Sequence, residues 1–146
     1  MSDELNGHTP ITHWLVGGAG LIWNLFGFMI YLTQVRATPE QMAQQYDAAQ
    51  VAFMDAIPMW ATSANAIAVT AGVLACVMLL LRKSMALPLF IVSLVALLVQ
   101  DLYSFVLVDA VAVFGMVPAY IQGTVLVVAI ALILYTHGAK KRFLLR

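Results

Sequence analysis

The sequence predicts an all-α polytopic membrane protein with four transmembrane helices and one short external amphipathic helix. Composition is the first indication, because 63% of the 146 residues are hydrophobic and only 10% are charged. A soluble domain carries about 25% charged residues. The second indication is that the apolar residues form four separate runs. Each run has roughly 20 residues, the length that a helix needs to cross the hydrocarbon core of a bilayer.

The four runs give the expected spans in order: about 13–33, 58–81, 85–108 and 117–137. Together they predict a single transmembrane helical domain over residues 1–146. The second and third spans are joined by the tight connection "RKS" (82–84). The third and fourth are joined by "DAVAVFGMVP" (109–118), which is apolar enough to lie in the membrane interface or to form part of a helix.

The long connection between the first two spans contains a helix start. Thr38 is suited to the N-cap, Pro39 to the first helical position, and Gln41 to closing a capping box. Apolar side chains then recur at helical spacing, at Met42, Tyr46, Ala49 and Phe53. We therefore expect an amphipathic helix over about 39–55. It would lie on the outer surface of the membrane or act as a lid on the bundle.

Orientation is predicted from the basic residues, which concentrate on the cytoplasmic side of bacterial membrane proteins. The loop after the first span has Arg36 alone. The "RKS" connection and the stretch after the fourth span carry the other six, namely Arg82, Lys83, Lys140, Lys141, Arg142 and Arg146. Both termini are therefore expected in the cytoplasm. The amino-terminal stretch "MSDELNGHTPITHW" has no basic region ahead of its apolar run, so we expect it to be retained rather than cleaved.

Small residues form a seam along each of the first two spans. Membrane helices pack through such residues because lipid provides no hydrophobic drive for them to associate. Each seam also includes one asparagine, and a packing role is the simpler interpretation. The first seam is Gly17, Gly20, Asn24, Gly27 and Tyr31, and the second is Ala61, Asn65, Ala68, Gly72 and Ala75. Cys76, the single cysteine, is expected to be a buried packing thiol.

The third span contains a carboxylate, Asp101, within "LLVQDLYSFVLVD" (97–109). A charged side chain at the bilayer centre costs roughly 2.5–3.5 kcal/mol on insertion scales. Asp101 follows the start of its span by about 16 residues, or roughly 24 Å of helix, so we expect it in the outer quarter of the membrane. Two interpretations remain open. Asp101 either bonds a Tyr or Gln to tie helix ends together, or it belongs to a solute or proton site open to the outside.

Other functional classes find little support in the sequence. The formal net charge is zero, and no basic patch suggests a nucleic-acid partner. There is no HExxH motif, glycine-rich phosphate loop or deep Ser-His-Asp set, so enzymatic activity is not expected. His13 and His137 are expected at the membrane interface without a ligating role, and we predict no metal or other cofactor.

Three segments resemble a known family. They are "LIWNLFGFMIYLTQ" (21–34), "PMWATSANAIAVTAGVLACVMLLLRKSMALPLFIVSL" (58–94) and "VQDLYSF" (99–105). They resemble small four-helix bacterial inner-membrane proteins that are commonly labelled "sugar transporter". The resemblance covers about residues 20–107 and implies a four-helix inner-membrane fold. It supplies no site residues, and the Ser84–Met85 connection departs from the more basic and aromatic one expected in this family.

Two functions remain as hypotheses. The first is a transporter or small-solute binder with an outward-facing polar pocket formed by Asn24, Asn65, Asp101, Tyr103 and Gln122. The second is a non-enzymatic accessory or assembly subunit whose small-residue seams dock onto the helices of a partner. Four short helices enclose little volume, so transport would require a cavity shared between copies in a homo-oligomer.

Overall fold

The computed structural model describes residues 8–142 and 144–146, and the start of the expected amino-terminal segment lies outside this range. Four long helices are long and apolar enough to cross a membrane: α1 (Ile11–Arg36), α4 (Met59–Leu80), α5 (Ala86–Asp101) with its continuation η2 (Leu102–Leu107), and α7 (Val117–Lys141). Three short helices connect them: α2 (Pro39–Gln45), α3 (Ala48–Asp55) and α6 (Ala110–Phe114). The predicted class, an all-α polytopic membrane protein, is confirmed.

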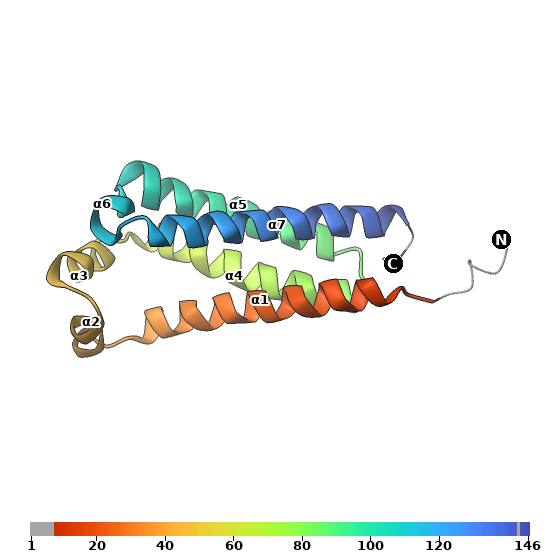
Figure 1. Ribbon diagram of the computed structural model, residues 1–146, viewed down its shortest axis with the longest axis horizontal. Coiled ribbons are helices and arrows are strands. Elements are labelled where there is room, and N and C mark those ends of the chain that lie inside the picture. The colour runs from red at the N-terminus through yellow and green to blue at the C-terminus, as the bar shows by residue number, and fades with distance from the viewer. Residues whose placement is uncertain (1–7, 143) are drawn as a thin grey trace.

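The long helices form an open arrangement rather than a closed bundle. α4 and α5 pack against each other as the central pair, α1 packs against α4, and α7 packs against α5 (Figure 1). The short helices α2, α3 and α6 lie together at one end of the molecule, and α1 begins and α7 finishes at the other. The two ends of the molecule therefore contain different elements, with short connecting helices at one end and the outer termini of α1 and α7 at the other.

Charge divides these two ends, with one exception, among the described residues. We call one the basic end, defined by Arg82, Lys83, Lys140, Lys141, Arg142 and Arg146. We call the other the acidic end, defined by Glu40, Asp47, Asp55, Asp101 and Asp109. Arg36, at the end of α1, is the one described basic residue at the acidic end.

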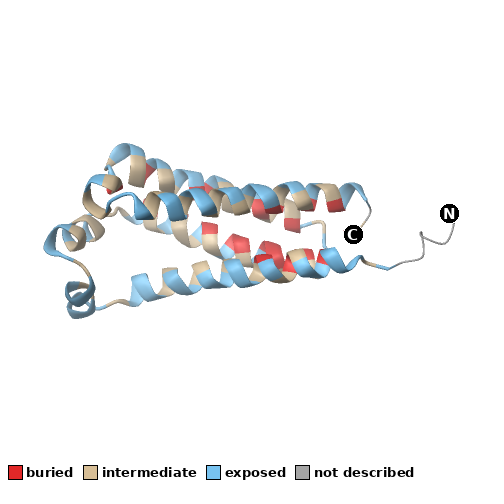
Figure 2. Cartoon of the chain, viewed as in Figure 1, coloured by how far each residue is buried: buried red, intermediate tan, exposed pale blue. Residues whose placement is uncertain are grey.

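Burial follows the same division in the two outer helices. The buried residues of α1 are His13, Gly17 and Gly20, all within its first ten residues. Those of α7 are Leu132, Thr136 and Ala139, all in its second half. By contrast, α4 has buried residues from Ala61 to Leu79 (Figure 2). The outer helices are therefore anchored at the basic end and less tightly packed toward the acidic end.

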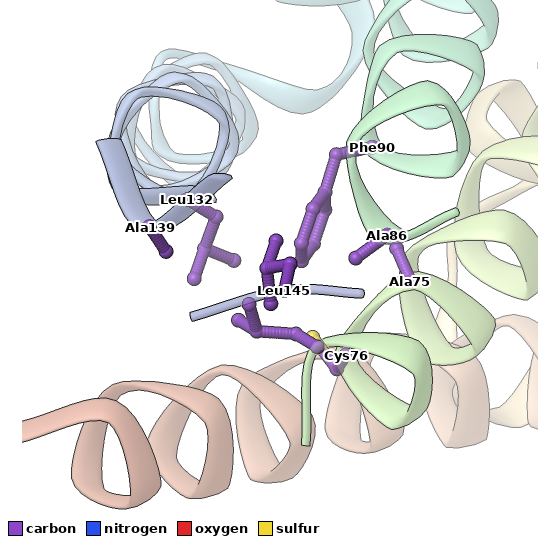
Figure 3. Close-up of a cluster of buried hydrophobic side chains, with 8 residues drawn as sticks. Ala75, Cys76, Ala86, Phe90, Leu132, Ala139 and Leu145 are labelled. Atoms are coloured by element: carbon purple, nitrogen blue, oxygen red, sulfur yellow. The ribbon is translucent and has the colours of Figure 1, made fainter. Parts of the chain in front are cut away.

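The main apolar core lies at the basic end. Leu79, Phe90 and Leu132 meet there from α4, α5 and α7, and Leu145 inserts between them (Figure 3). The 144–146 segment is held by backbone bonds from Arg146 N to the Arg82 carbonyl and from Ser84 N to the Arg146 carbonyl, both 2.7 Å. The Arg82 Nε also donates to the Leu144 carbonyl at 2.9 Å. These bonds close the basic end of the core.

The amphipathic segment is divided into two helices, where the sequence predicted one helix over 39–55. The predicted capping box at Thr38 is present, with both the Thr38 hydroxyl and the Gln41 side chain engaged. A second capping box starts α3, since the Asp47 carboxylate accepts from Gln50 N at 2.8 Å and the Gln50 side chain accepts from Asp47 N at 3.1 Å. This second cap favours a new helix start over continuation through Tyr46, whose backbone is extended.

The third membrane helix changes its winding directly after Asp101. Residues 102–107 form the π-helix η2, which closes with a bond from Val108 N to the Tyr103 carbonyl at 3.1 Å. Asp109 then adopts a left-handed backbone, φ 46°, and its carboxylate accepts from Ala112 N to cap α6. A π-helix is rare and is frequently found at functional sites. The sequence pattern gave no indication of this change.

Candidate functional site

The α5–α7 interface near the acidic end holds the most unusual polar group of the molecule. Asp101 is the last residue of α5, about 22 Å of helix from Ala86, and the Gln122 carboxamide on α7 lies beside its carboxyl group. Both Asp101 carboxyl oxygens and the Gln122 Nε2 are shielded from solvent. Within the part of the chain that the structure describes, none of these three atoms has a hydrogen-bonding partner.

This pair bears on both interpretations of Asp101, because Gln122 lies within hydrogen-bonding reach of the carboxyl group although this geometry forms no bond. If Asp101 tied helix ends together, its oxygens would accept hydrogen bonds from Tyr103 or Gln122. Instead, the Tyr103 hydroxyl donates to the Ala56 carbonyl at 3.4 Å. A small rotation would let Gln122 donate to one Asp101 oxygen, but the second oxygen would still have no partner. A buried polar atom without a partner costs about 1–3 kcal/mol, so this arrangement is unfavourable unless another group binds there.

Two of the other predicted site residues make contacts elsewhere. Tyr103 is buried on η2, where its ring meets Trp60 edge-on at a centroid distance of 5.3 Å. Its hydroxyl bond to Ala56 joins η2 to the end of α3. Asn24 lies between α1 and α4, where its Nδ2 donates to the Gly20 carbonyl at 2.8 Å and to the Cys76 Sγ at 3.4 Å. The polar atoms of Asn24 and Tyr103 are therefore used in packing.

Asn65 is half-buried on α4, on the seam of small residues that includes Ala61 and Ala68. Of the five predicted site residues, Asp101 and Gln122 are the pair that the structure brings side by side. Other residues line both a groove between α1 and α7 and a hollow between α2 and α3. The site that remains is a two-residue polar pair.

The small-residue seams pack as predicted over part of their length. A side chain at Gly72 would collide with the Asn24 Oδ1, so the asparagine occupies the space that this glycine leaves on α4. A side chain at Gly17 would collide with Leu80. Gly27, by contrast, has no neighbouring atom within 4 Å of where its Cβ would lie. Cys76 is a buried free thiol, as expected.

His13 was expected at the membrane interface without a ligating role, and the structure places it inside the protein at the basic end. Its side chain is fully buried, with Nε2 2.9 Å from the Leu79 carbonyl and Nδ1 3.3 Å from the Tyr135 hydroxyl. Because a carbonyl only accepts, Nε2 carries the proton and Nδ1 accepts from Tyr135. His13 thus links α1 to both α4 and α7. His137 is exposed, as expected.

Sequence reasoning missed this link because neither partner is close in sequence. His13 is 66 residues from Leu79 and 122 from Tyr135. The available signal was the position of His13, four residues before Gly17 on the same helix face as the glycine seam. No group of three or more His, Cys, Asp or Glu side chains suited to a metal ion occurs among the described residues.

The fold and the polar pair define the class of this chain as a polytopic α-helical membrane protein. No protein-family model matches the chain, and no curated protein and no solved structure is significantly similar to it.

Proposed function

We propose that this protein binds a small polar solute between α5 and α7 and acts as a transporter of that solute. The observation that carries the proposal is the half-buried pair of Asp101 and Gln122, in which both Asp101 carboxyl oxygens and the Gln122 Nε2 are shielded from solvent and have no partner among the described residues. A polar or ionisable side chain within a membrane-spanning segment is expensive to keep there. A solute that bonds both side chains would offset that cost.

The chemistry of the pair favours a hydroxylated solute. The Asp101 carboxylate accepts hydrogen bonds, and the Gln122 Nε2 donates them. A hydroxyl group donates and accepts at once, so neighbouring hydroxyls of a polyol or sugar complement both residues. This agrees with the "sugar transporter" label of the family that the sequence resembles. The π-helix that begins directly after Asp101 supports a functional role for this stretch.

The separation of basic and acidic residues between the two ends supports one orientation of the proposed transporter in the membrane. The positive-inside rule favours a cytoplasmic basic end, with both termini inside and the acidic end outside the inner membrane of a bacterium. Asp101 would then be reached from the outer face. Because the core of the chain is filled by its own side chains, we propose that a homo-oligomer supplies the rest of the path.

A ligand-stabilisation screen tests the proposal. The purified protein in detergent is melted with each member of a panel of sugars and polyols, with matched concentrations of sodium chloride as a blank. We expect at least one polyol to raise the melting temperature of the wild type. Asp101→Asn should abolish that shift, because an amide replaces one acceptor oxygen by a donor.

Asp55→Asn is the matched control, since Asp55 is an exposed carboxylate at the same end. The control should retain the full shift. An equal shift in wild type and Asp101→Asn, or no shift with any member of the panel, would reject the proposed solute site.

A second candidate function is an accessory subunit of a membrane complex, and it rests on the acidic-end half of α1. No residue of α1 beyond Gly20 is buried. The exposed side chains of this half are large and apolar, among them Ile22, Phe26 and Met29. A helix of another membrane protein would pack on such a face as well as lipid does. Co-purification with a different membrane protein at fixed stoichiometry, together with a negative solute screen, would favour this function.

A further inference from the structure

A groove of about 450 Å³ lies between α1 and α7, and the proposed solute site makes no use of it. Its walls are apolar apart from the Tyr135 hydroxyl, which is already bonded to His13. The groove is lined by Val16, Ala19, Gly20 and Trp23 from α1, and by Val128, Ala131, Leu132 and Tyr135 from α7.

The groove exists because the first and last membrane helices barely touch. A side chain at Gly20 would come within 3.0 Å of Leu132, so the end of the Leu132 side chain reaches α1 at this glycine. On either side of that approach, Ala19, Trp23 and Ala131 are exposed. In a bilayer, this groove therefore opens sideways into lipid.

The groove spans about two thirds of the thickness of one leaflet of a bilayer. Its lining on α7 runs from Val128 to Tyr135, which is about 10 Å of helix. Half of a hydrocarbon core is about 15 Å thick. Both walls belong to the parts of α1 and α7 that lie toward the basic end, so the groove faces the leaflet at that end. Its shape and position suit a single acyl chain.

The end of the groove nearest the membrane surface is positively charged. Arg142, the C-cap of α7, follows Tyr135 by seven residues, and its positive charge is close enough to act on the Tyr135 phenol. Lys140 and Lys141 are exposed on the last turn. The Thr12 hydroxyl also lies beside Tyr135. All acidic residues that the structure describes lie at the opposite end.

We propose that the α1–α7 groove binds one anionic phospholipid. An acyl chain lies between Ala19 and Ala131, and the phosphate group is held by Arg142 and Thr12 at the surface. Arginine pairs well with phosphate oxygens, and basic pockets between membrane helices bind anionic lipid head groups.

A second copy of this chain is a poorer occupant of the groove than a lipid. A second copy seated in this groove would place its own basic end against Arg142, and like charges repel, whereas the proposed homo-oligomer shares its cavity near Asp101 at the acidic end. A zwitterionic lipid offers the same chains but no net negative charge. The positive charge at the surface end of the groove therefore favours an anionic lipid over both a zwitterionic lipid and a second copy of the chain.

Native mass spectrometry of the full chain in detergent tests this proposal. Phosphatidylglycerol and phosphatidylcholine with identical acyl chains are titrated separately, and the dissociation constant of the first bound lipid is measured. We expect phosphatidylglycerol to bind at least about fivefold more tightly, the ratio that corresponds to one basic residue near the head group. Equal dissociation constants would overturn the proposal.

Two variants locate the site. Ala131→Trp fills the groove and should remove the tight phosphatidylglycerol site, whereas Val127→Trp is the control on an exposed position of α7 outside the groove. Arg142→Gln should reduce the preference for phosphatidylglycerol by about fivefold, whereas Arg36→Gln at the acidic end should leave it unchanged.

Melting temperatures establish that each variant is folded. If Ala131→Trp unfolds, the comparison of Arg142→Gln with Arg36→Gln shows whether the lipid binds at the groove. Wild-type lipid preference in Arg142→Gln, or retained tight binding in folded Ala131→Trp, would show that the lipid binds elsewhere and reject the groove.

Discussion

The basic and acidic ends of this molecule differ in how many of their buried polar atoms are hydrogen-bonded and in how tightly their apolar side chains are packed. At the basic end, the fully buried His13 bonds through both ring nitrogens and Leu145 fills the space between three helices. At the acidic end, the Asp101 carboxyl oxygens and the Gln122 Nε2 are shielded from solvent without a hydrogen-bonding partner among the described residues, and the parts of α1 and α7 at that end have no buried residue. The difference indicates that the basic end is the more completely packed of the two.

The largest effect is expected from deleting core volume at the basic end. Leu79 is fully buried, so Leu79→Ala should leave a cavity and lower the free energy of unfolding by about 2–4 kcal/mol. Leu102 is 52% exposed near the acidic end, and Leu102→Ala should cost less than about 1 kcal/mol. Reversible unfolding in mixed detergent micelles measures both. Similar losses for the two variants would remove the distinction between the ends.

A smaller loss is expected from breaking the His13 link. His13→Leu keeps the apolar volume but leaves the Tyr135 hydroxyl without its acceptor, at about 1–3 kcal/mol. His137→Leu alters an exposed histidine at the same end and serves as the control, with no measurable change expected. The same unfolding measurement applies. If His13→Leu were as stable as the wild type, the link would not contribute to anchoring α1.

The smallest effect is expected at the acidic end, from Tyr103→Phe. The hydroxyl bond to the Ala56 carbonyl is long, at 3.4 Å, and the ring contact with Trp60 is kept in the variant. We expect a loss of at most about 0.5 kcal/mol. A loss above 1.5 kcal/mol would mean that Tyr103 is a main support of this end.

The sequence was sufficient to predict the elements whose determinants are local. Four spans follow from apolar runs of the right length, and the start of α2 follows from the Thr38 capping box. The division after Tyr46 could also have been found, since Asp47 and Gln50 have the same spacing as Thr38 and Gln41. That second signal was overlooked because the apolar period continues through Tyr46.

The arrangement of the site depends on tertiary packing that no local pattern encodes. Asp101 and Gln122 lie on different helices, and their side-by-side position depends on how α7 packs on α5. The same holds for Asn24. From the sequence alone its amide could face a pocket, whereas in the structure it bonds to Gly20 and Cys76. A pattern of polar residues at similar depth predicted one pocket, whereas the helices turn these residues toward different neighbours.

The contrast between the two ends depends most on Asp101, whose carboxyl oxygens make no hydrogen bond to the described residues of the unliganded protein. The most direct test is the free energy of unfolding of Asp101→Asn, measured beside the wild type without added solute. The two side chains have nearly the same shape, and the carboxyl oxygens make no hydrogen bond that the amide would lose. We therefore predict that Asp101→Asn is as stable as the wild type or more stable. A loss of more than about 1 kcal/mol would show that Asp101 is bonded in the folded protein, and would contradict the account.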